Sequence, residues 1–241
     1  MEIIIAILVT INIVLIGVII KLSNKYEYAK EEAEKAIFEL FMKDAYEQRL
    51  LWFKTLNRDA NVPSTVFIGD SLIQEWPIQE MFQNSEYLNR GIGGDTTANL
   101  LNRLETSFKH LTPTRVVILI GTNDLVQPDF DMYLTVSRIQ ESIKKIQIMY
   151  PKIAIYLCSL LPVGNPKIEK MDKQTIGVRD NQTIDAINEA LSQIESINYL
   201  NINEVLKDEQ GYLNPQYSRE GLHLSPEGYK AVVKLFKEHG F

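Results

Sequence analysis

Apolar residues follow three different patterns along this chain. Residues 3–20 form a run without a charged side chain, and residues 24–57 contain no Pro or Gly and are rich in Glu, Lys, Ala and Leu. From residue 62 onward, short β-branched runs alternate with amphipathic stretches. These three patterns are typical of a buried or membrane helix, a charged helix and a βα fold. We therefore predict a transmembrane anchor, a helical linker or docking helix, and one globular domain, with the boundaries 1–22, 23–61 and 62–241.

The first run has the length of a membrane-spanning helix. At about 1.5 Å per residue, residues 3–20 span roughly 27 Å as a helix, close to the thickness of the hydrocarbon layer. A signal peptide would carry positive charge before the run and a small-residue cleavage site after it, whereas Glu2 precedes this run and Lys21 and Lys25 follow it. Since nothing obvious would bury the helix in a soluble core, we predict a retained single-pass anchor in the cell membrane.

The charges beside this run indicate an orientation. Lys21, Lys25 and Lys30 lie on its C-terminal flank, and its N-terminal flank has no Lys or Arg. The positive-inside rule therefore places the rest of the chain on the cytoplasmic side of the membrane, with the extracellular side as the alternative.

The second stretch predicts one long helix or two. Its first half, residues 25–35, is charged and is expected to be solvated. Its second half carries large apolar side chains, namely Ile37, Phe38, Leu40, Phe41, Leu50, Leu51, Trp52 and Phe53. These favour docking on the globular domain over lying on the membrane, and they leave open whether the stretch is a spacer or a part of that domain.

The third segment predicts an α/β fold. Apolar, β-branched runs indicate strands at residues 63–68, 86–90, 115–120, 153–158 and 197–201. Apolar residues at helical spacing indicate helices at residues 131–149, 180–194 and 225–237. Strands that alternate with helices form a parallel sheet with helices on both faces.

Polar turns follow the first three strands, at the edge where a parallel sheet brings side chains into one crevice. Gly69-Asp-Ser71 follows the first strand, residues 91–97 follow the second, and residues 121–124 follow the third. Taken singly these are ordinary features, since the first can cap a helix and the second can be a tight turn. The second also imitates a dinucleotide-binding loop, but the position of the third glycine is Thr96, which makes a nucleotide-binding module a poor alternative.

Taken together, the turns supply the groups of a nucleophilic hydrolysis. Ser71 lies where a helix begins, and His223 precedes the last helix with Glu220 three residues before it. A hydroxyl, an imidazole and a carboxylate serve as nucleophile, base and orienting partner in a serine hydrolase. The oxyanion formed on attack needs preplaced donors, and the candidates are the N–H groups of Ser71 and Gly94 and the side-chain amide of Asn123.

This set of motifs resembles the SGNH (GDSL-type) hydrolases, and most closely the branch that includes the platelet-activating-factor acetylhydrolase catalytic subunits. The matching stretches are Val66-Phe-Ile-Gly-Asp-Ser71, Arg90-Gly-Ile-Gly-Gly-Asp-Thr-Thr97, Gly121-Thr-Asn-Asp124 and Glu220-Gly-Leu-His223. The resemblance implies a flavodoxin-like three-layer α/β/α sandwich with a five-stranded parallel sheet. It also implies hydrolysis of a short-chain acyl ester, such as an acetyl ester, through an acyl-serine intermediate. With a membrane anchor, the expected substrate is an ester of a lipid, a glycan or a small metabolite.

Position 220 departs from the family pattern, which has Asp three residues before the histidine. Glu220 is one methylene longer, so it can orient His223 only if its loop retracts by about 1.5 Å, roughly one C–C bond. We expect Glu220 to be the third catalytic member, with Arg219 a solvated neighbour. The alternatives are a Ser-His dyad oriented by a backbone carbonyl, and an SGNH-fold binding or scaffolding domain at the membrane that has lost efficient catalysis.

Composition argues against several other classes. A net charge of −6 gives no electrostatic footprint for a nucleic-acid partner. The single cysteine, Cys158, lies in an apolar run and is expected in the core rather than as a nucleophile. No cluster of Cys, His or carboxylates has metal-ligand spacing, so neither a metal nor another cofactor is expected. The long loop at residues 161–177 either forms a wall of the crevice or lies on the surface.

Overall fold

The computed structural model of this protein describes residues 1–58 and 63–241. Its contacts divide the chain into two compact units, Met1–Gln48 and Arg49–Phe241. Helix α1 (Glu2–Leu56) begins in the first unit and ends in the second. The boundary expected at residue 62 lies outside the described residues, so the division into three segments stays a prediction.

The first unit consists of helix α1 up to Gln48, and its large apolar side chains from Ile3 to Phe41 are exposed. Among the described helices, α1 is long and apolar enough to cross a membrane, a criterion that an N-terminal signal sequence also meets. The side chains of Ile37, Phe38, Leu40 and Phe41 are exposed as well. These four side chains belong to the first unit, so their docking on the globular domain stays a prediction.

The last turns of α1 are part of the second unit's core. Phe53 is 2% exposed, and the guanidinium groups of Arg49 and Arg90 lie 5.1 Å and 5.0 Å from the centre of its ring. Arg90 also donates to the side-chain oxygen of the fully buried Asn57, and Arg49 donates to the carbonyl of Gly91 at 2.9 Å. These contacts settle that the end of the helical stretch belongs to the domain and holds the strand that leads into the glycine-rich turn.

The sheet of the second unit has five parallel strands, as the sequence predicted. The strands are β1 (Pro63–Gly69), β2 (Tyr87–Gly91), β3 (Thr112–Leu119), β4 (Ala154–Cys158) and β5 (Asn198–Leu200), in the order β2-β1-β3-β4-β5. The central strands are buried on both faces, and Val66, Phe67 and Ile68 are fully buried. Near-continuous apolar runs are what such doubly covered strands require.

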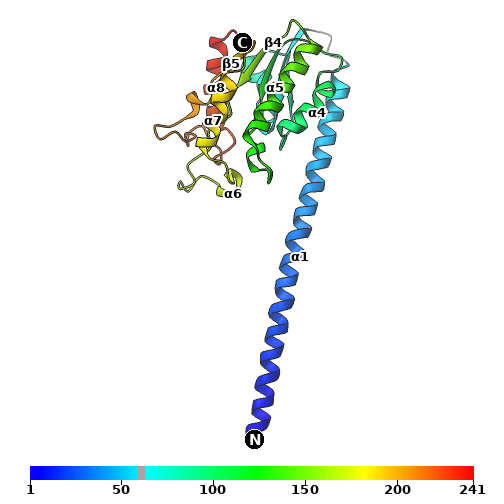
Figure 1. The fold of residues 1–241 in the computed structure, drawn as a ribbon, viewed down its shortest axis with the longest axis vertical. Coiled ribbons are helices and arrows are strands. Elements are labelled where there is room, and N and C mark those ends of the chain that lie inside the picture. Colours follow the sequence, from blue (N-terminus) through cyan, green and yellow to red (C-terminus); the bar gives the residue numbers. More distant parts are fainter. Residues whose placement is uncertain (59–62) are drawn as a thin grey trace. The chain divides into compact units, whose positions relative to one another are not determined.

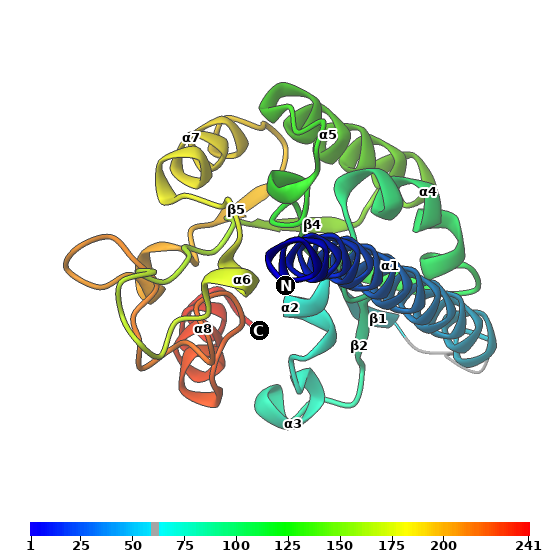
Figure 2. The same ribbon diagram turned by 90° about the horizontal axis from the view of Figure 1, so that it is seen from below.

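Helices cover both faces of the sheet, which gives the three-layer α/β/α architecture (Figures 1 and 2). One face packs against α4 (Thr97–Phe108), α5 (Met132–Met149) and α7 (Asn181–Ser192). The other face packs against α2 (Ser71–Gln74), α3 (Ile78–Phe82) and α8 (Pro226–Glu238). The three helices with predicted bounds correspond to α5, α7 and α8 within two residues, and α2 begins at Ser71 as expected, whereas α3, α4 and the short α6 (Lys173–Ile176) are additional.

Strand order places the polar turns next to one another. The chain leaves β1 toward β2 on one side and returns to β3 on the other, so the order reverses beside β1. In the register of the sheet, Gly69 at the end of β1 pairs with Gly91 of β2 and with Leu119 of β3. The turns after these strands therefore leave the sheet side by side, at a switch point where open α/β sheets form binding crevices.

Candidate active site

The turn between β1 and α2 presents Ser71. A Cβ at Gly69 would lie 1.9 Å from the carbonyl oxygen of Leu119, so only glycine lets β1 and β3 approach this closely. Asp70 is fully buried and caps α2, because its Oδ1 accepts from the N–H of Leu72 at 2.9 Å. Burial raises the pKa of Asp70 to about 7. Asp70 is thus the cap, and Ser71 is the first helical residue, whose N–H has no acceptor within the helix.

Ser71 and His223 are far apart in sequence but lie within hydrogen-bonding distance. The Ser71 Oγ is 3.0 Å from the His223 Nε2, and the His223 Nδ1 is 2.5 Å from the Glu220 Oε1. Since an ionised carboxylate only accepts, Nδ1 carries the proton of this pair and Nε2 accepts from the hydroxyl. In this arrangement the imidazole can take the serine proton while the carboxylate stabilises the resulting cation.

The loop around Glu220 accommodates its longer side chain. Gly221 has a φ of +110°, which glycine adopts without strain, and its N–H donates to the Ser218 Oγ at 2.6 Å. The chain folds back so that the backbone N–H of His223 also donates to the Glu220 Oε1, at 3.1 Å. One carboxylate oxygen of Glu220 therefore accepts from both the backbone and the ring of the same histidine.

Arg219 holds the other oxygen of Glu220. Its Nε donates to the Glu220 Oε2 at 2.9 Å. Its Nη1 donates, also at 2.9 Å, to the Oε2 of Glu75, the residue that follows α2. Burial by itself raises the pKa of Glu220, but the hydrogen bonds from His223 and Arg219 outweigh it and hold that pKa below its usual value. Arg219 is solvated as expected, since its side chain is 55% exposed, and it also bridges two carboxylates.

The glycine-rich turn lies against Ser71. A Cβ at Gly93 would be 3.9 Å from the Cβ of Ser71, and the N–H of Gly93 donates to the side-chain oxygen of Gln74 at 2.8 Å. Gly94 is exposed and has a φ of +75°. Because Gly94 is exposed and has no side chain, its backbone N–H is accessible and suited to donate to a bound carbonyl.

The side-chain amide of Asn123 has a fixed orientation. Its Nδ2 donates to the carbonyl of Asp95 at 3.0 Å, and its Oδ1 accepts from the Nη2 of Arg179 at 3.0 Å. A carboxamide nitrogen has two hydrogens, so one N–H of Asn123 remains for a ligand.

Buried charges connect these turns behind the crevice. Arg103 donates to Asp95 at 2.7 Å and to the carbonyl of Gly69 at 2.9 Å, and Asp124 accepts from the N–H and hydroxyl of Thr97. Burial raises the pKa of Asp95 to about 6. Sequence reasoning missed this network and the contacts of Gln74 and Arg179, because each depends on partners that are distant along the chain.

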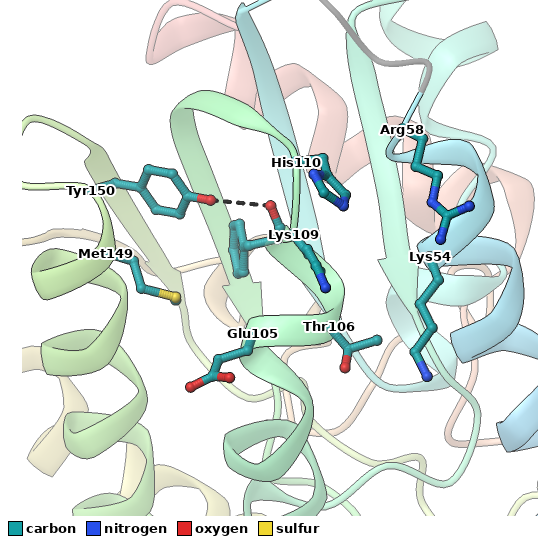
Figure 3. A pocket seen from close by; sticks show the side chains of 9 residues that line it. Lys54, Arg58, Glu105, Thr106, Lys109, His110, Met149 and Tyr150 are labelled. Carbon is teal, nitrogen blue, oxygen red and sulfur yellow. Dashed lines mark hydrogen bonds between the residues drawn. The ribbon is translucent and has the colours of Figure 1, made fainter.

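A cavity of about 600 Å³ lies away from these groups (Figure 3). Its walls include Lys54, Arg58, Lys109 and His110. His110 precedes β3, so this cavity is at the amino edge of the sheet, whereas Ser71 follows the carboxyl end of β1. The cavity contains none of the predicted catalytic residues.

Two other features complete the chemical inventory. Cys158 is buried, and burial raises the pKa of its thiol, which suits a core residue and not a nucleophile. Within residues 1–58 and 63–241, no three His, Cys, Asp or Glu side chains are grouped to hold a metal ion.

The fold and the serine-centred site define a serine ester hydrolase with an α/β/α sandwich. The chain belongs to the GDSL-like lipase/acylhydrolase family, whose model matches residues 67–231. It is similar to the platelet-activating factor acetylhydrolase IB subunit alpha1 of Rattus norvegicus, with 30% identity over 182 residues that cover 71% of this chain and 72% of the relative. These findings confirm the resemblance drawn from the four motifs.

Solved structures agree with this assignment. A structure described as a putative platelet activating factor from Streptococcus pneumonia is 30% identical, with a TM-score of 0.78 over 85% of this chain and 97% of that one. An acetyl xylan esterase, AlAXEase, shares the fold at 20% identity, with a TM-score of 0.59 over 74% of this chain and 100% of that one.

Proposed function

We propose that the protein is a membrane-anchored serine esterase that hydrolyses a short-chain acyl ester, in particular an acetyl ester, of a lipid, a glycan or a small metabolite. The observation that carries the proposal is the continuous chain of contacts from the Ser71 hydroxyl through His223 to Glu220. The substrate class is supported by the name of the similar platelet-activating factor acetylhydrolase subunit.

Acylation of the enzyme follows from this geometry. The Ser71 Oγ attacks the ester carbonyl while the His223 Nε2 takes the hydroxyl proton, and Glu220 stabilises the imidazolium. The tetrahedral oxyanion accepts from the N–H groups of Ser71 and Gly94 and from the free amide hydrogen of Asn123. Collapse breaks the bond to the alkoxide, which receives the proton from His223, and leaves an acyl-serine.

Deacylation repeats these steps with water. His223 takes a proton from the water as its oxygen attacks the acyl-serine, and the same donors hold the second oxyanion. Collapse releases the carboxylic acid and returns the proton to the Ser71 oxygen. The two steps consume only the ester and water, and they require no redox partner or cofactor.

The placement at a membrane rests on the apolar run in α1. We propose that residues 1–22 form the anchor, residues 23–61 a helical linker or docking helix whose end from Arg49 packs in the domain, and residues 62–241 the hydrolase domain. The flanking Lys21, Lys25 and Lys30 favour a cytoplasmic domain, with the extracellular face as the alternative. Protease treatment of intact cells separates the two, since digestion of the domain from outside contradicts the cytoplasmic orientation.

The central test is turnover of p-nitrophenyl esters of increasing acyl length by the full chain in detergent. The acetyl ester should be hydrolysed fastest, and Ser71→Ala should abolish turnover of every ester. A wild-type protein without activity toward any of them would instead favour a binding or scaffolding domain. The contact between Glu220 and His223 removes the main reason to expect such a loss of catalysis.

A further inference from the structure

The side-chain amide of Asn123 can serve as an oxyanion donor in only one of its two orientations, and its contacts select that orientation. A carboxamide can turn by 180° and exchange its oxygen for its nitrogen, and an oxygen aimed at the oxyanion would repel it. The backbone carbonyl of Asp95 selects the nitrogen on one side, since it can only accept. On the other side the Nη2 of Arg179 lies 3.0 Å from the Asn123 Oδ1, and a guanidinium can only donate. The two contacts together exclude the flipped amide.

Arg179 is itself rigidly held. Its side chain is 9% exposed, and its Nε donates to the carbonyl of Thr122 at 2.8 Å. Its Nη1 donates to the carbonyls of Thr175 and Ile176, both at 3.0 Å. All three guanidinium nitrogens are therefore engaged in a planar fork that the compact ammonium of lysine cannot reproduce.

The loop that leads to Arg179 is also hydrogen-bonded to the segment that contains Glu220. The N–H of Gly164 donates to the carbonyl of Gly221, and the N–H of Asp172 donates to the carbonyl of Glu220, both at 2.8 Å. A Cβ at Gly221 would lie 2.7 Å from Ile176, which shows how tightly the two segments pack. The loop at residues 161–177 thus runs from the triad acid to the arginine that orients Asn123.

We propose that Arg179 is a positioning residue for the oxyanion hole. It holds the Asn123 carboxamide with its nitrogen toward the reacting carbonyl, and through the loop at residues 161–177 it keeps this amide in register with Glu220 and His223. The inference rests on the proposed role of Asn123 in ester hydrolysis.

A double-mutant cycle on the full chain in detergent tests the proposal, with p-nitrophenyl acetate as the substrate. Arg179→Met should lower kcat by about 100-fold, the usual effect of losing one oxyanion donor, with KM changed by less than about threefold. Asn123→Ala should lower kcat to a similar extent. Adding Arg179→Met to Asn123→Ala should cost less than about a further threefold, because the arginine then has no amide to orient.

Two further variants separate positioning from folding. Arg179→Lys keeps a positive charge beside the buried Asp70 and should retain the fold, yet it should lose most of the activity. Arg115→Met is the matched control, since Arg115 donates to Thr65 and Gly240 at the opposite edge of the sheet and its loss should leave kcat unchanged. Guanidinium added to Arg179→Ala should restore part of kcat and should not restore Asn123→Ala.

The outcomes are distinct. The proposal is overturned if Arg179→Lys keeps kcat within threefold of the wild type, or if the losses from Arg179→Met and Asn123→Ala multiply in the double variant, as two independent structural effects would. Ser71→Ala serves as the check on the underlying function. If that variant remains active, the proposed hydrolysis at Ser71 fails, whereas an inactive Ser71→Ala beside a fully active Arg179→Lys refutes only the role of Arg179.

Discussion

Replacing Glu220 by aspartate, the residue usual in the family, should lower the activity of this enzyme. In the structure the Glu220 Oε1 lies 2.5 Å from the His223 Nδ1. Removing one methylene withdraws the carboxylate by about 1.5 Å, beyond hydrogen-bonding distance, unless the loop follows. The loop is held in place by the bond from the N–H of Asp172 to the Glu220 carbonyl and by the bond from the N–H of Gly221 to Ser218.

The size of the loss follows from the contact that is removed. A hydrogen bond to a charged group contributes roughly 1.5–3 kcal/mol, which corresponds to a fall of roughly 10- to 150-fold in kcat/KM. Glu220→Ala should be at least as slow as Glu220→Asp. Arg219→Ala should cost less than about fivefold, because half-exposed ion pairs contribute about 1 kcal/mol or less.

The assay is steady-state hydrolysis of p-nitrophenyl acetate by the three variants and the wild type at one pH, with thermal unfolding measured in parallel. An aspartate variant as active as the wild type would show that the loop does adjust and that the bonds which hold it are weak. An alanine variant within about twofold of the wild type would remove Glu220 from the mechanism altogether.

Three further predictions concern the packing and buried charge of the domain. Phe53→Ala should lower the free energy of unfolding in urea by about 3–5 kcal/mol, whereas Trp52→Ala, whose side chain is 58% exposed, should change it by less than about 0.5 kcal/mol; equal effects would contradict the docking of the end of α1. Gly69→Ala should abolish folding or activity, because its Cβ would meet the carbonyl of Leu119 at 1.9 Å, and a fully active variant would contradict this register of β1 and β3. Since burial raises the pKa of Asp70 from 3.8 to about 7, its contribution to stability is complete below about pH 4 and is lost as the pH rises through 7. As the pH rises from 5 to 8, the melting temperature of Asp70→Asn should therefore fall less than that of the wild type. An equal fall in both proteins would contradict the raised pKa of Asp70.

The sheet could be predicted from the sequence because its central strands are buried on both faces. Residues 66–68 and 116–120 are continuously apolar, and the βα alternation then requires parallel neighbours. The long helices α5, α7 and α8 carry apolar residues at helical spacing. Helix α4 begins at Thr97, inside the motif that was assigned to a turn, and α2 and α3 are too short to show a period.

Some residues of the site could also be predicted from the sequence, and others could not. Ser71, Gly94 and Asn123 follow the ends of strands, so the predicted strands were enough to place them at one edge of the sheet. Arg179 and Arg219 contact Asn123 and Glu220 through side chains whose positions depend on how loops fold onto the sheet. An arginine in a loop has the same sequence context whether it is solvated or holds a catalytic group.

Which apolar residues of α1 are buried could not be predicted from the sequence either. Ile37 and Phe53 are both large apolar residues on one continuous helix, yet only Phe53 is buried. What distinguishes them is the ring of distant partners around Phe53, including Arg90 and Arg103, and no local pattern reports these. Hydrophobicity alone therefore does not tell which part of the helix is buried in the core of the domain.

The most direct measurement of the central claim is the chemical trapping of the acyl-enzyme. The full chain in detergent is mixed with p-nitrophenyl acetate, quenched in acid within the first turnover, digested and analysed by mass spectrometry. The account predicts a burst of one p-nitrophenol per active enzyme, with an acetyl group on Ser71 that is absent from Ser71→Ala and much reduced in His223→Ala. An acetyl group on another residue, or undiminished turnover by Ser71→Ala, would contradict it.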